Sequence, residues 1–140
     1  MHDPLQGIEH ISNNLTIANL LKFCERQEIG ITRPMIQNYI RDGVLPPPVG
    51  KRFYTHKHLA ALVLIDRLKT VFDMPTVKAA LEPYMDSEGI PLSDYTAMLA
   101  KLATVTAAWQ QNIAPLVATE SDGGVILSML FAAEIKSAIV

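Results

Sequence analysis

TRPMIQNYIRDGVLPPPVGKRFY, residues 32–54, contains the strongest local structural signals of this chain. Its first half predicts a short helix over residues 33–42, because the Thr32 hydroxyl can accept an amide hydrogen bond at the helix start and proline is tolerated in the first turn. Gly43 suits the left-handed residue that ends a helix. Three consecutive prolines then form a stiff link, and residues 49–54 predict a small basic β-hairpin.

The predicted helix has one apolar face and one polar face. Ile36, Tyr39 and Ile40 fall at the spacing of a buried stripe. The polar side chains opposite are Arg33, Gln37, Asn38 and Arg41. A guanidinium group binds phosphate or the guanine edge, and a carboxamide matches the adenine edge in the major groove, so the first three are candidate base contacts.

Positive charge is concentrated around this helix and hairpin. Residues 31–58 contain five Lys and Arg against one Asp, a local charge of +4 in a chain whose total is −2. Lys51 and Lys57 are therefore candidate phosphate contacts. A solvated helix face is the alternative interpretation of the polar row, but the cations of the hairpin favour a polyanion as the partner.

Three motifs in this region resemble a known family. YIRDGVLPP (residues 39–47) ends a helix with Tyr, a basic residue, Gly, Leu and Pro. RFYT (residues 52–55) then reads as a strand and the start of the next helix, and FDMPTVKAAL (residues 72–81) follows. Together they resemble the winged helix-turn-helix of the MerR (mercury-resistance regulator) family, and more closely a family of small MerR-like proteins described as a domain of unknown function.

The resemblance covers roughly the first 85 residues and implies a DNA-binding dimer. In that arrangement Arg41, Arg52 and Tyr54 lie near phosphates. Gln37 and Asn38 stand where the family usually has Arg and Tyr, so the contact that clamps the DNA backbone in the family is not carried over to them.

The remaining chain suggests one small head and an assembly region. At 49% hydrophobic and 19% charged residues, the composition is more apolar than a lone small domain needs, which favours a subunit interface. We expect a mainly α protein with three parts: an N-terminal arm (residues 1–14), a winged helix-turn-helix DNA-binding domain with a β-hairpin wing (residues 15–85), and a C-terminal helical region for dimerisation or packing (residues 91–140). The arm should be loosely ordered, with Ile8 and Ile11 able to dock on a partner or on the core.

Within the predicted head, two more helices flank the first one. Thr16 can cap a helix that ends near Gln27, and its apolar stripe includes Cys24, which we interpret as a buried small hydrophobe. Thr55 can cap another that runs to about Phe72. His56 and His58 start that helix, where we expect solvated or phosphate-facing roles. A short helix then opens at residues 74–76, and residues 85–91 are polar and turn-rich, as expected of a boundary.

A long apolar stripe begins at Leu92 and advances in steps of three and four through Trp109 and Ile113 to Leu116. Pro115 should end or kink this helix. Residues 120–124 predict a turn, and residues 125–140 predict a final apolar helix that is too short and too charged to span a bilayer. We expect the region to pair two chains, although packing on the chain's own head is the alternative.

Other classes of function find little support in the residues. No nucleophile elbow, phosphate loop or metal-ligand cluster is present, so we expect no catalysis, no metal and no cofactor. The single cysteine excludes a disulfide framework, and the absence of a signal peptide favours the cytoplasm. The aromatic side chains of Tyr84, Tyr95 and Trp109 are candidates to line an effector pocket. Such residues more often belong to a core, and they do not identify a ligand.

These features predict a sequence-specific transcriptional regulator that binds double-stranded DNA as a homodimer. Helix 33–42 would lie in the major groove, and wing 49–54 would lie on phosphates. Eight residues of helix cover roughly 12 Å, or about three to four base pairs. So short a site is not unique in a genome. Specific recognition therefore requires a dimer that binds an inverted repeat. The alternative is a winged module that binds protein through its apolar C-terminal half.

Overall fold

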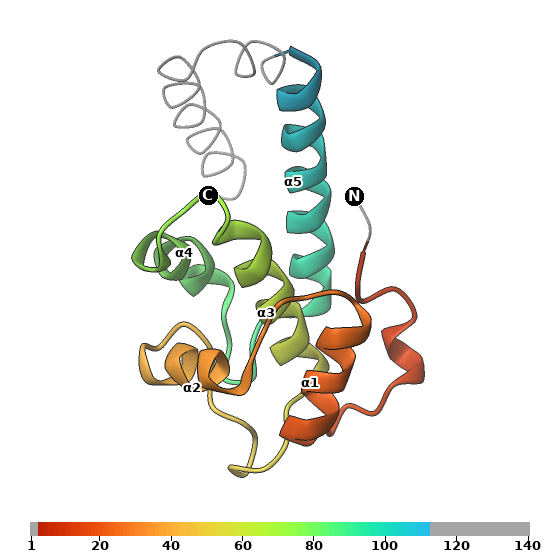
Figure 1. Ribbon diagram of the computed structural model, residues 1–140, viewed down its shortest axis with the longest axis vertical. Coiled ribbons are helices and arrows are strands. Elements are labelled where there is room, and N and C mark those ends of the chain that lie inside the picture. Colours follow the sequence, from red (N-terminus) through yellow and green to blue (C-terminus); the bar gives the residue numbers. More distant parts are fainter. Residues whose placement is uncertain (1–2, 113–140) are drawn as a thin grey trace. The chain divides into compact units, whose positions relative to one another are not determined.

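The computed structural model describes residues 3–112, and within this range the chain is mainly helical and contains no β-sheet (Figure 1). The helices are α1 (Ile17–Arg26), α2 (Arg33–Arg41), α3 (His56–Leu68), α4 (Met74–Leu81) and α5 (Leu92–Asn112), with short 3-10 turns η1 (Ile8–His10) and η2 (Glu82–Tyr84). The described residues up to Tyr95 form one compact unit, and those from Thr96 on belong to a second.

α3 forms the centre of the first unit and lies between α1, α2 and α4 in Figure 1. Its buried side chains are His58, Leu59, Ala60, Ala61, Leu62, Val63, Leu64, Ile65 and Leu68. A helix that is apolar on nearly all sides has to be surrounded by other elements. The neighbouring helices therefore each place one apolar face against it, and their polar faces remain outside.

The helix predicted to run to about Phe72 ends earlier, at Leu68. The Leu68 carbonyl oxygen accepts hydrogen bonds from the amides of Val71 and Phe72, at 3.0 and 2.9 Å, which closes the helix with a turn. Asp73 then caps α4, because its Oδ1 accepts from the Thr76 amide at 2.9 Å. Hydrogen bonds from the side chain and then the backbone amide of Thr76 lower the pKa of Asp73. This local cap stops α3 from continuing.

Residues 3–14 belong to the first unit, and the expected docking of Ile8 on the core is confirmed. Leu5 and Ile8 are buried. His56 connects this segment to the start of α3, because its Nε2 donates to the Ile11 carbonyl oxygen at 2.8 Å and its amide donates to Asn13 Oδ1 at 2.8 Å. Since these partners are more than forty residues apart in the chain, no local sequence pattern predicts the two hydrogen bonds.

A second contact fixes the beginning of the same segment. The Tyr95 hydroxyl donates to Asp3 Oδ1 at 2.6 Å, and the tyrosine ring is buried. Burial, followed by the bond to Asp3, raises the pKa of Tyr95. The first and last parts of the unit are thereby tied together, and Tyr95 serves as a core residue.

Residues 85–91, predicted to be a turn-rich boundary, form a loop that is fastened to the first turn of α3. The Ile90 amide donates to the Lys57 carbonyl oxygen at 3.1 Å. Asp86 Oδ1 accepts from the amides of Glu88 and Gly89, at 2.8 and 3.1 Å, and Asp86 Oδ2 accepts from Lys57 Nζ at 2.7 Å. The bond from Lys57 is the largest cause that lowers the pKa of Asp86. The loop is a support for α3.

The interpretation of Cys24 as a buried hydrophobe is confirmed. Its side chain is 1% exposed. Burial, with a smaller contribution from the charge of Asp66, raises the pKa of the thiol to about 11. The thiolate that a nucleophile or metal ligand requires is therefore disfavoured.

The long helix predicted from Leu92 is present as α5, which the structure describes as far as Asn112. Ile113, Leu116 and Pro115, the turn at 120–124 and the helix at 125–140 lie outside the described residues. No helix between residues 3 and 112 is long and apolar enough to cross a membrane.

Candidate nucleic-acid interface

α2 begins and ends as its sequence predicts. Thr32 Oγ1 accepts from the Met35 amide at 3.4 Å, proline occupies the first turn, and Gly43 follows the helix with a φ of 74°. Burial of Ile36 and Tyr39 fixes the rotation of the helix. The four polar side chains of the opposite face, Arg33, Gln37, Asn38 and Arg41, are exposed as a consequence.

The predicted hairpin is reduced to a single antiparallel bridge between Val49 and Phe53. Their backbones exchange two hydrogen bonds, of 2.7 Å from the Val49 amide and 3.1 Å from the Phe53 amide. Gly50 and Lys51 both have positive φ, 59° and 63°, and this pair of left-handed residues tightens the turn. Two exposed cations, Lys51 and Arg52, stand at its end.

The proline link that carries this turn is held by a buried histidine. His58 is 0% exposed. Its Nε2 donates to the Pro47 carbonyl oxygen at 3.0 Å, while its Nδ1 accepts from the Thr55 amide at 3.0 Å. The expected solvated or phosphate-facing role of His58 is wrong, because the side chain caps α3 and anchors the link.

This arrangement requires a neutral imidazole, since one ring nitrogen donates and the other accepts. Burial is the largest effect on His58 and lowers its pKa, although hydrogen bonds to Pro47 and Pro46 and the charges of Glu88 and Asp86 act in the opposite direction. A histidine with a lowered folded pKa contributes stability that is complete above its unfolded pKa, about 6.5. That stability is lost as the pH falls below this value.

We therefore expect the free energy of unfolding to decrease between pH 7.5 and pH 5.5. His58→Gln keeps a donor for Pro47 but does not titrate, so it should lower stability at pH 7.5 and remove most of this pH dependence. Urea titrations of both proteins at the two pH values measure the effect. Equal pH dependence in both proteins would show that another group is responsible.

α2 and the 48–54 segment together form a groove of about 200 Å³. Its lining residues are Ile17, Arg33, Ile36, Gln37, Pro48, Lys51, Arg52 and Tyr54. The groove brings two predicted base contacts, Arg33 and Gln37, next to the cations of the turn. Ile17, Ile36 and Pro48 contribute apolar side chains to its lining, and Arg33, Lys51 and Arg52 contribute three cations.

Two predicted contacts on α2 lie outside this groove. Asn38 and Arg41 are exposed but do not line it. The Arg41 Nε donates to Asp42 Oδ1 at 3.1 Å, and both side chains are solvent-accessible. An exposed pair of this kind is weak, so phosphate can compete for Arg41.

Lys57, another predicted phosphate contact, is engaged elsewhere. Its Nζ lies 2.7 Å from Asp86 Oδ2 and 3.9 Å from Glu88 Oε2. The hydrogen bond to Asp86 is the largest cause that raises the pKa of Lys57. With two carboxylates beside it, Lys57 adds no net positive charge to a surface for polyanions.

Tyr54 lines the groove but is 7% exposed. Its ring packs edge-on against His58, with centroids 5.2 Å apart. Its backbone forms a bridge with Leu15, with two hydrogen bonds of 2.8 Å. Burial raises the pKa of Tyr54 and the charge of Arg33 lowers it. Tyr54 thus mainly attaches the 49–53 turn to the first unit, and little of its side chain is exposed for contact with phosphate.

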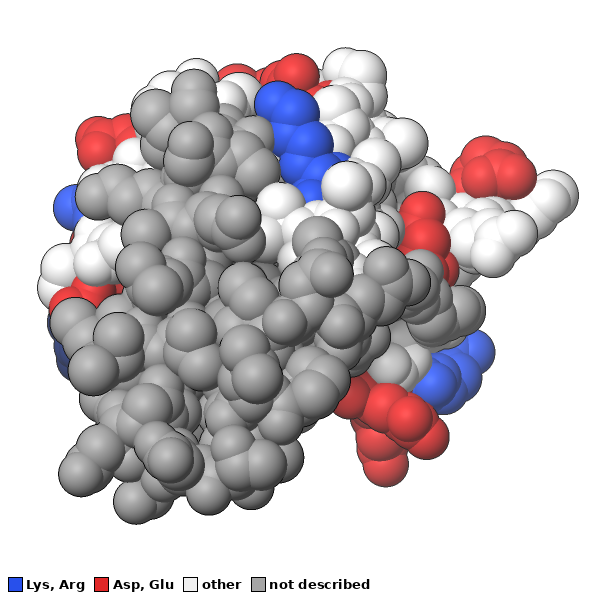
Figure 2. All heavy atoms as spheres, turned by 90° about the horizontal axis from the view of Figure 1, so that it is seen from above, with Lys and Arg blue, Asp and Glu red and all other residues white. Residues whose placement is uncertain are grey.

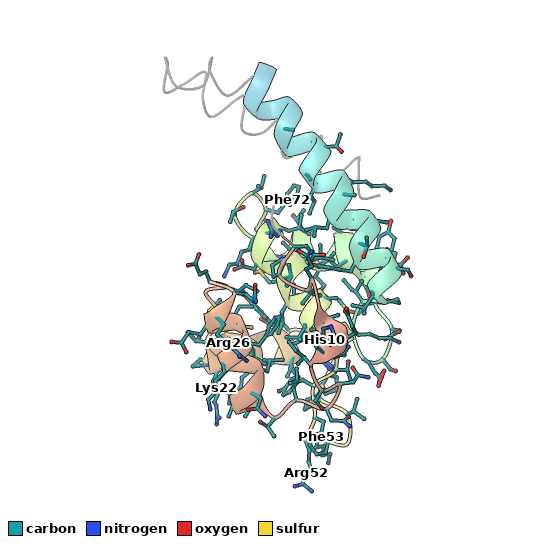
Figure 3. The ribbon with its side chains drawn as sticks, turned by 90° about the vertical axis from the view of Figure 1, so that its right-hand side faces the viewer. His10, Lys22, Arg26, Arg52, Phe53 and Phe72 are labelled. Atoms are coloured by element: carbon teal, nitrogen blue, oxygen red, sulfur yellow. The ribbon has the colours of Figure 1, made fainter. Side chains whose placement is uncertain are left out.

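Ile17 and Pro48 also line the groove, and no local pattern of the sequence connects them with α2. Two further cations, Lys22 and Arg26, lie outside the predicted site. Both are exposed on α1, and Figure 3 shows them apart from Arg52, which projects from the end of the turn. The described part of the face in Figure 2 carries basic and acidic side chains interspersed with uncharged ones.

Among the described residues, no group of His, Cys, Asp and Glu is arranged to hold a metal ion.

Comparison with known proteins gives one family. Residues 8–96, more than half of the chain, match the model of a family described as a domain of unknown function (DUF1836). No curated protein and no solved structure matches the chain. The matched residues cover nearly all of the first compact unit, including α2, the turn and the loop at 85–91.

Proposed function

The chain belongs to the family described as a domain of unknown function (DUF1836), and we propose that it is a sequence-specific DNA-binding regulator with a winged helix-turn-helix of the MerR type. The single observation that carries the proposal is the groove between α2 and the 48–54 turn. It combines a carboxamide, Gln37, with the three cations Arg33, Lys51 and Arg52 on one exposed surface.

The roles of the side chains follow from their chemistry. α2 is nine residues long and enters the major groove with its exposed face, where Gln37 matches an adenine and Arg33 a guanine. Asn38 extends this row of base contacts. Lys51, Arg52 and Arg41 bind phosphates, which fixes the orientation of the helix but conveys no sequence. Lys57 takes no part, because Asp86 and Glu88 neutralise it.

The Val49–Phe53 turn corresponds to a wing reduced to one bridge. Three features make so short a hairpin rigid enough for this role. Successive prolines precede it, Pro47 is bound by the buried His58, and Tyr54 is bridged to Leu15. A preorganised turn loses little conformational entropy when its cations meet phosphate.

The regulator acts as a homodimer, with the region from residue 91 to 140 as the pairing device. A dimer is needed because one α2 spans too few base pairs to select a genomic site. A two-fold dimer recognises an inverted repeat whose spacing equals the separation of the two α2 helices.

The test is selection of bound fragments from random duplex DNA, followed by affinity measurements over a salt series. We expect an inverted repeat, and a plot of log K against log salt with a slope of roughly −5 to −7 if three or four phosphates are neutralised per protomer. Enrichment of no sequence, with weak binding equal on all duplexes, would remove the proposal. That outcome would favour the alternative, a winged module that binds protein.

A further inference from the structure

The groove between α2 and the 48–54 segment contains a tyrosine hydroxyl that the fold does not use. Tyr54 lines the groove and is 7% exposed. Its backbone is bridged to Leu15 and its ring packs against His58, but its hydroxyl forms no hydrogen bond with another residue in the described part of the chain. The oxygen is not fully enclosed either, so a molecule in the groove can reach it. Buried tyrosine hydroxyls usually have a hydrogen-bond partner, and here a ligand can supply it.

Three cations surround this hydroxyl without an opposing charge. Arg33, Lys51 and Arg52 line the same groove. Among residues 3–112, no Asp or Glu lines it, and none of the three cations forms an ion pair. Burial raises the pKa of Tyr54 and the charge of Arg33 lowers it, which means that the guanidinium acts on the hydroxyl. A concave surface with charge of one sign concentrates counter-ions. The groove therefore favours an anion that accepts hydrogen bonds.

The rest of the lining limits the size and the chemistry of the ligand. Ile17, Ile36 and Pro48 contribute apolar side chains, and the groove holds about 200 Å³. Pockets for drug-sized ligands hold roughly 300–1,000 Å³, so an anion with a short carbon part fits here. A DNA duplex is too broad to enter a groove of this size, and its phosphates meet the exposed cations at the rim. The Tyr54 hydroxyl is thus open to a small anion and not to the DNA backbone.

We propose that this groove binds a small organic phosphate monoester. Its phosphoryl group accepts hydrogen bonds from the Tyr54 hydroxyl and the Arg33 guanidinium, and its carbon part packs on the apolar side chains of the lining. A phosphate monoester carries a charge of about −1.5 to −2 at neutral pH and three acceptor oxygens, whereas each phosphate of the DNA backbone carries a single charge. Because the ligand occupies the groove that Gln37 also lines, it excludes DNA. This regulatory consequence rests on the proposed function.

Calorimetric titration of the full chain with phenyl phosphate, a monoester with a small apolar ring, tests the site. Dimethyl phosphate is the comparison for the DNA backbone, since it is a diester with one charge. At constant ionic strength and pH 7.5, we expect phenyl phosphate to bind at least about tenfold more tightly than dimethyl phosphate. Benzyl alcohol, which has the ring without the charge, should not bind. Equal affinities for the monoester and the diester would overturn the inference.

Tyr54→Phe removes the hydroxyl but keeps the ring on His58 and the backbone bridge to Leu15, so its urea unfolding should remain close to that of the wild type. Its affinity for phenyl phosphate should fall about tenfold or more, because a hydrogen bond to a charged group is lost. Tyr39→Phe is the matched control, since Tyr39 is 8% exposed and does not line the groove. This variant should bind phenyl phosphate as the wild type does. No loss in Tyr54→Phe, or equal losses in both variants, would overturn the inference.

Competition with the selected duplex separates this inference from the proposed function. Phenyl phosphate should displace DNA from the wild-type protein at concentrations near its own dissociation constant, and about tenfold more should be needed for Tyr54→Phe. Simultaneous binding of phenyl phosphate and DNA would overturn the inference. So would a protein that selects a duplex but does not bind phenyl phosphate, and the proposed function would then stand. Failure to select any duplex would remove the proposed function, while the calorimetric titrations would still decide whether the groove binds the monoester.

Discussion

Gly89→Ala should lower the free energy of unfolding of the first unit by about 3–5 kcal/mol. A β-carbon at this position would lie 2.2 Å from the Lys57 carbonyl oxygen, 2.4 Å from its carbonyl carbon and 2.8 Å from the His58 amide nitrogen. These are backbone atoms of α3 and are not free to move aside. The φ of Gly89 is also 138°, which side chains rarely adopt.

The loss of stability should spread beyond the loop. The Ile90 amide binds the Lys57 carbonyl oxygen, so the clash would displace the same turn of α3 that presents His58 to Pro47. Gly30→Ala is the matched control, because no atom lies within 4 Å of the added carbon. It should change stability by no more than about 0.5 kcal/mol. Urea unfolding of both variants measures the contrast, and equal stabilities would mean that the loop does not lie against α3.

Neutralising the groove should have the largest effect on DNA binding. The triple variant Arg33→Gln, Lys51→Gln and Arg52→Gln should bind the selected duplex about 100-fold or more weakly, because it removes one base contact and two phosphate contacts from each protomer. All three side chains are exposed, so the variant should unfold at nearly the wild-type urea concentration. Affinity is measured by titration at fixed salt.

The control for this variant removes the same charge elsewhere. Lys22, Arg26 and Lys101 are exposed and do not line the groove. Changing all three to glutamine should weaken binding far less than the groove variant. If both triple variants lose the same affinity, the protein responds to net charge and the groove has no special role.

Single substitutions separate reading of bases from attachment to phosphates. Gln37→Ala should relax the preference for one sequence with a modest loss of affinity. Arg52→Ala should weaken binding to every sequence by a similar factor. Repeating the fragment selection with each variant distinguishes the two roles, and identical losses on all sequences from both variants would remove the claim that α2 reads bases.

Some of this molecule follows from neighbouring residues. α2 occupies Arg33–Arg41 as expected, with Thr32 as its cap and Gly43 in a left-handed conformation. A cap, a proline in the first turn and a terminal glycine act within three or four residues, so their effects can be deduced from the chain directly. The same holds for the start of α3 at Thr55. Its end differs from the prediction, because α3 stops at Leu68 and Asp73 caps the next helix.

Other features depend on partners that are distant in the chain. Lys57 was expected to bind phosphate, but Asp86, 29 residues later, occupies its ammonium group. His58 was expected to face solvent or phosphate, yet it is buried and holds Pro47. Docking of Ile8 and Ile11 on the core was expected, but the hydrogen bonds of Ile11 and Asn13 with His56 were not. Each of these contacts requires that the whole unit be folded before the two groups meet.

The sequence therefore predicted the polar row of α2 and the cationic turn, since helix periodicity and turn geometry are short-range effects. The packing of α3 and of the loop at 85–91 decides which cations remain available to a polyanion. It also places Lys51 and Arg52 beside Arg33 and Gln37. The physical reason is the range of the interactions. Caps and turns act over a few residues, whereas charge neutralisation and burial depend on distances in space that only the complete fold defines.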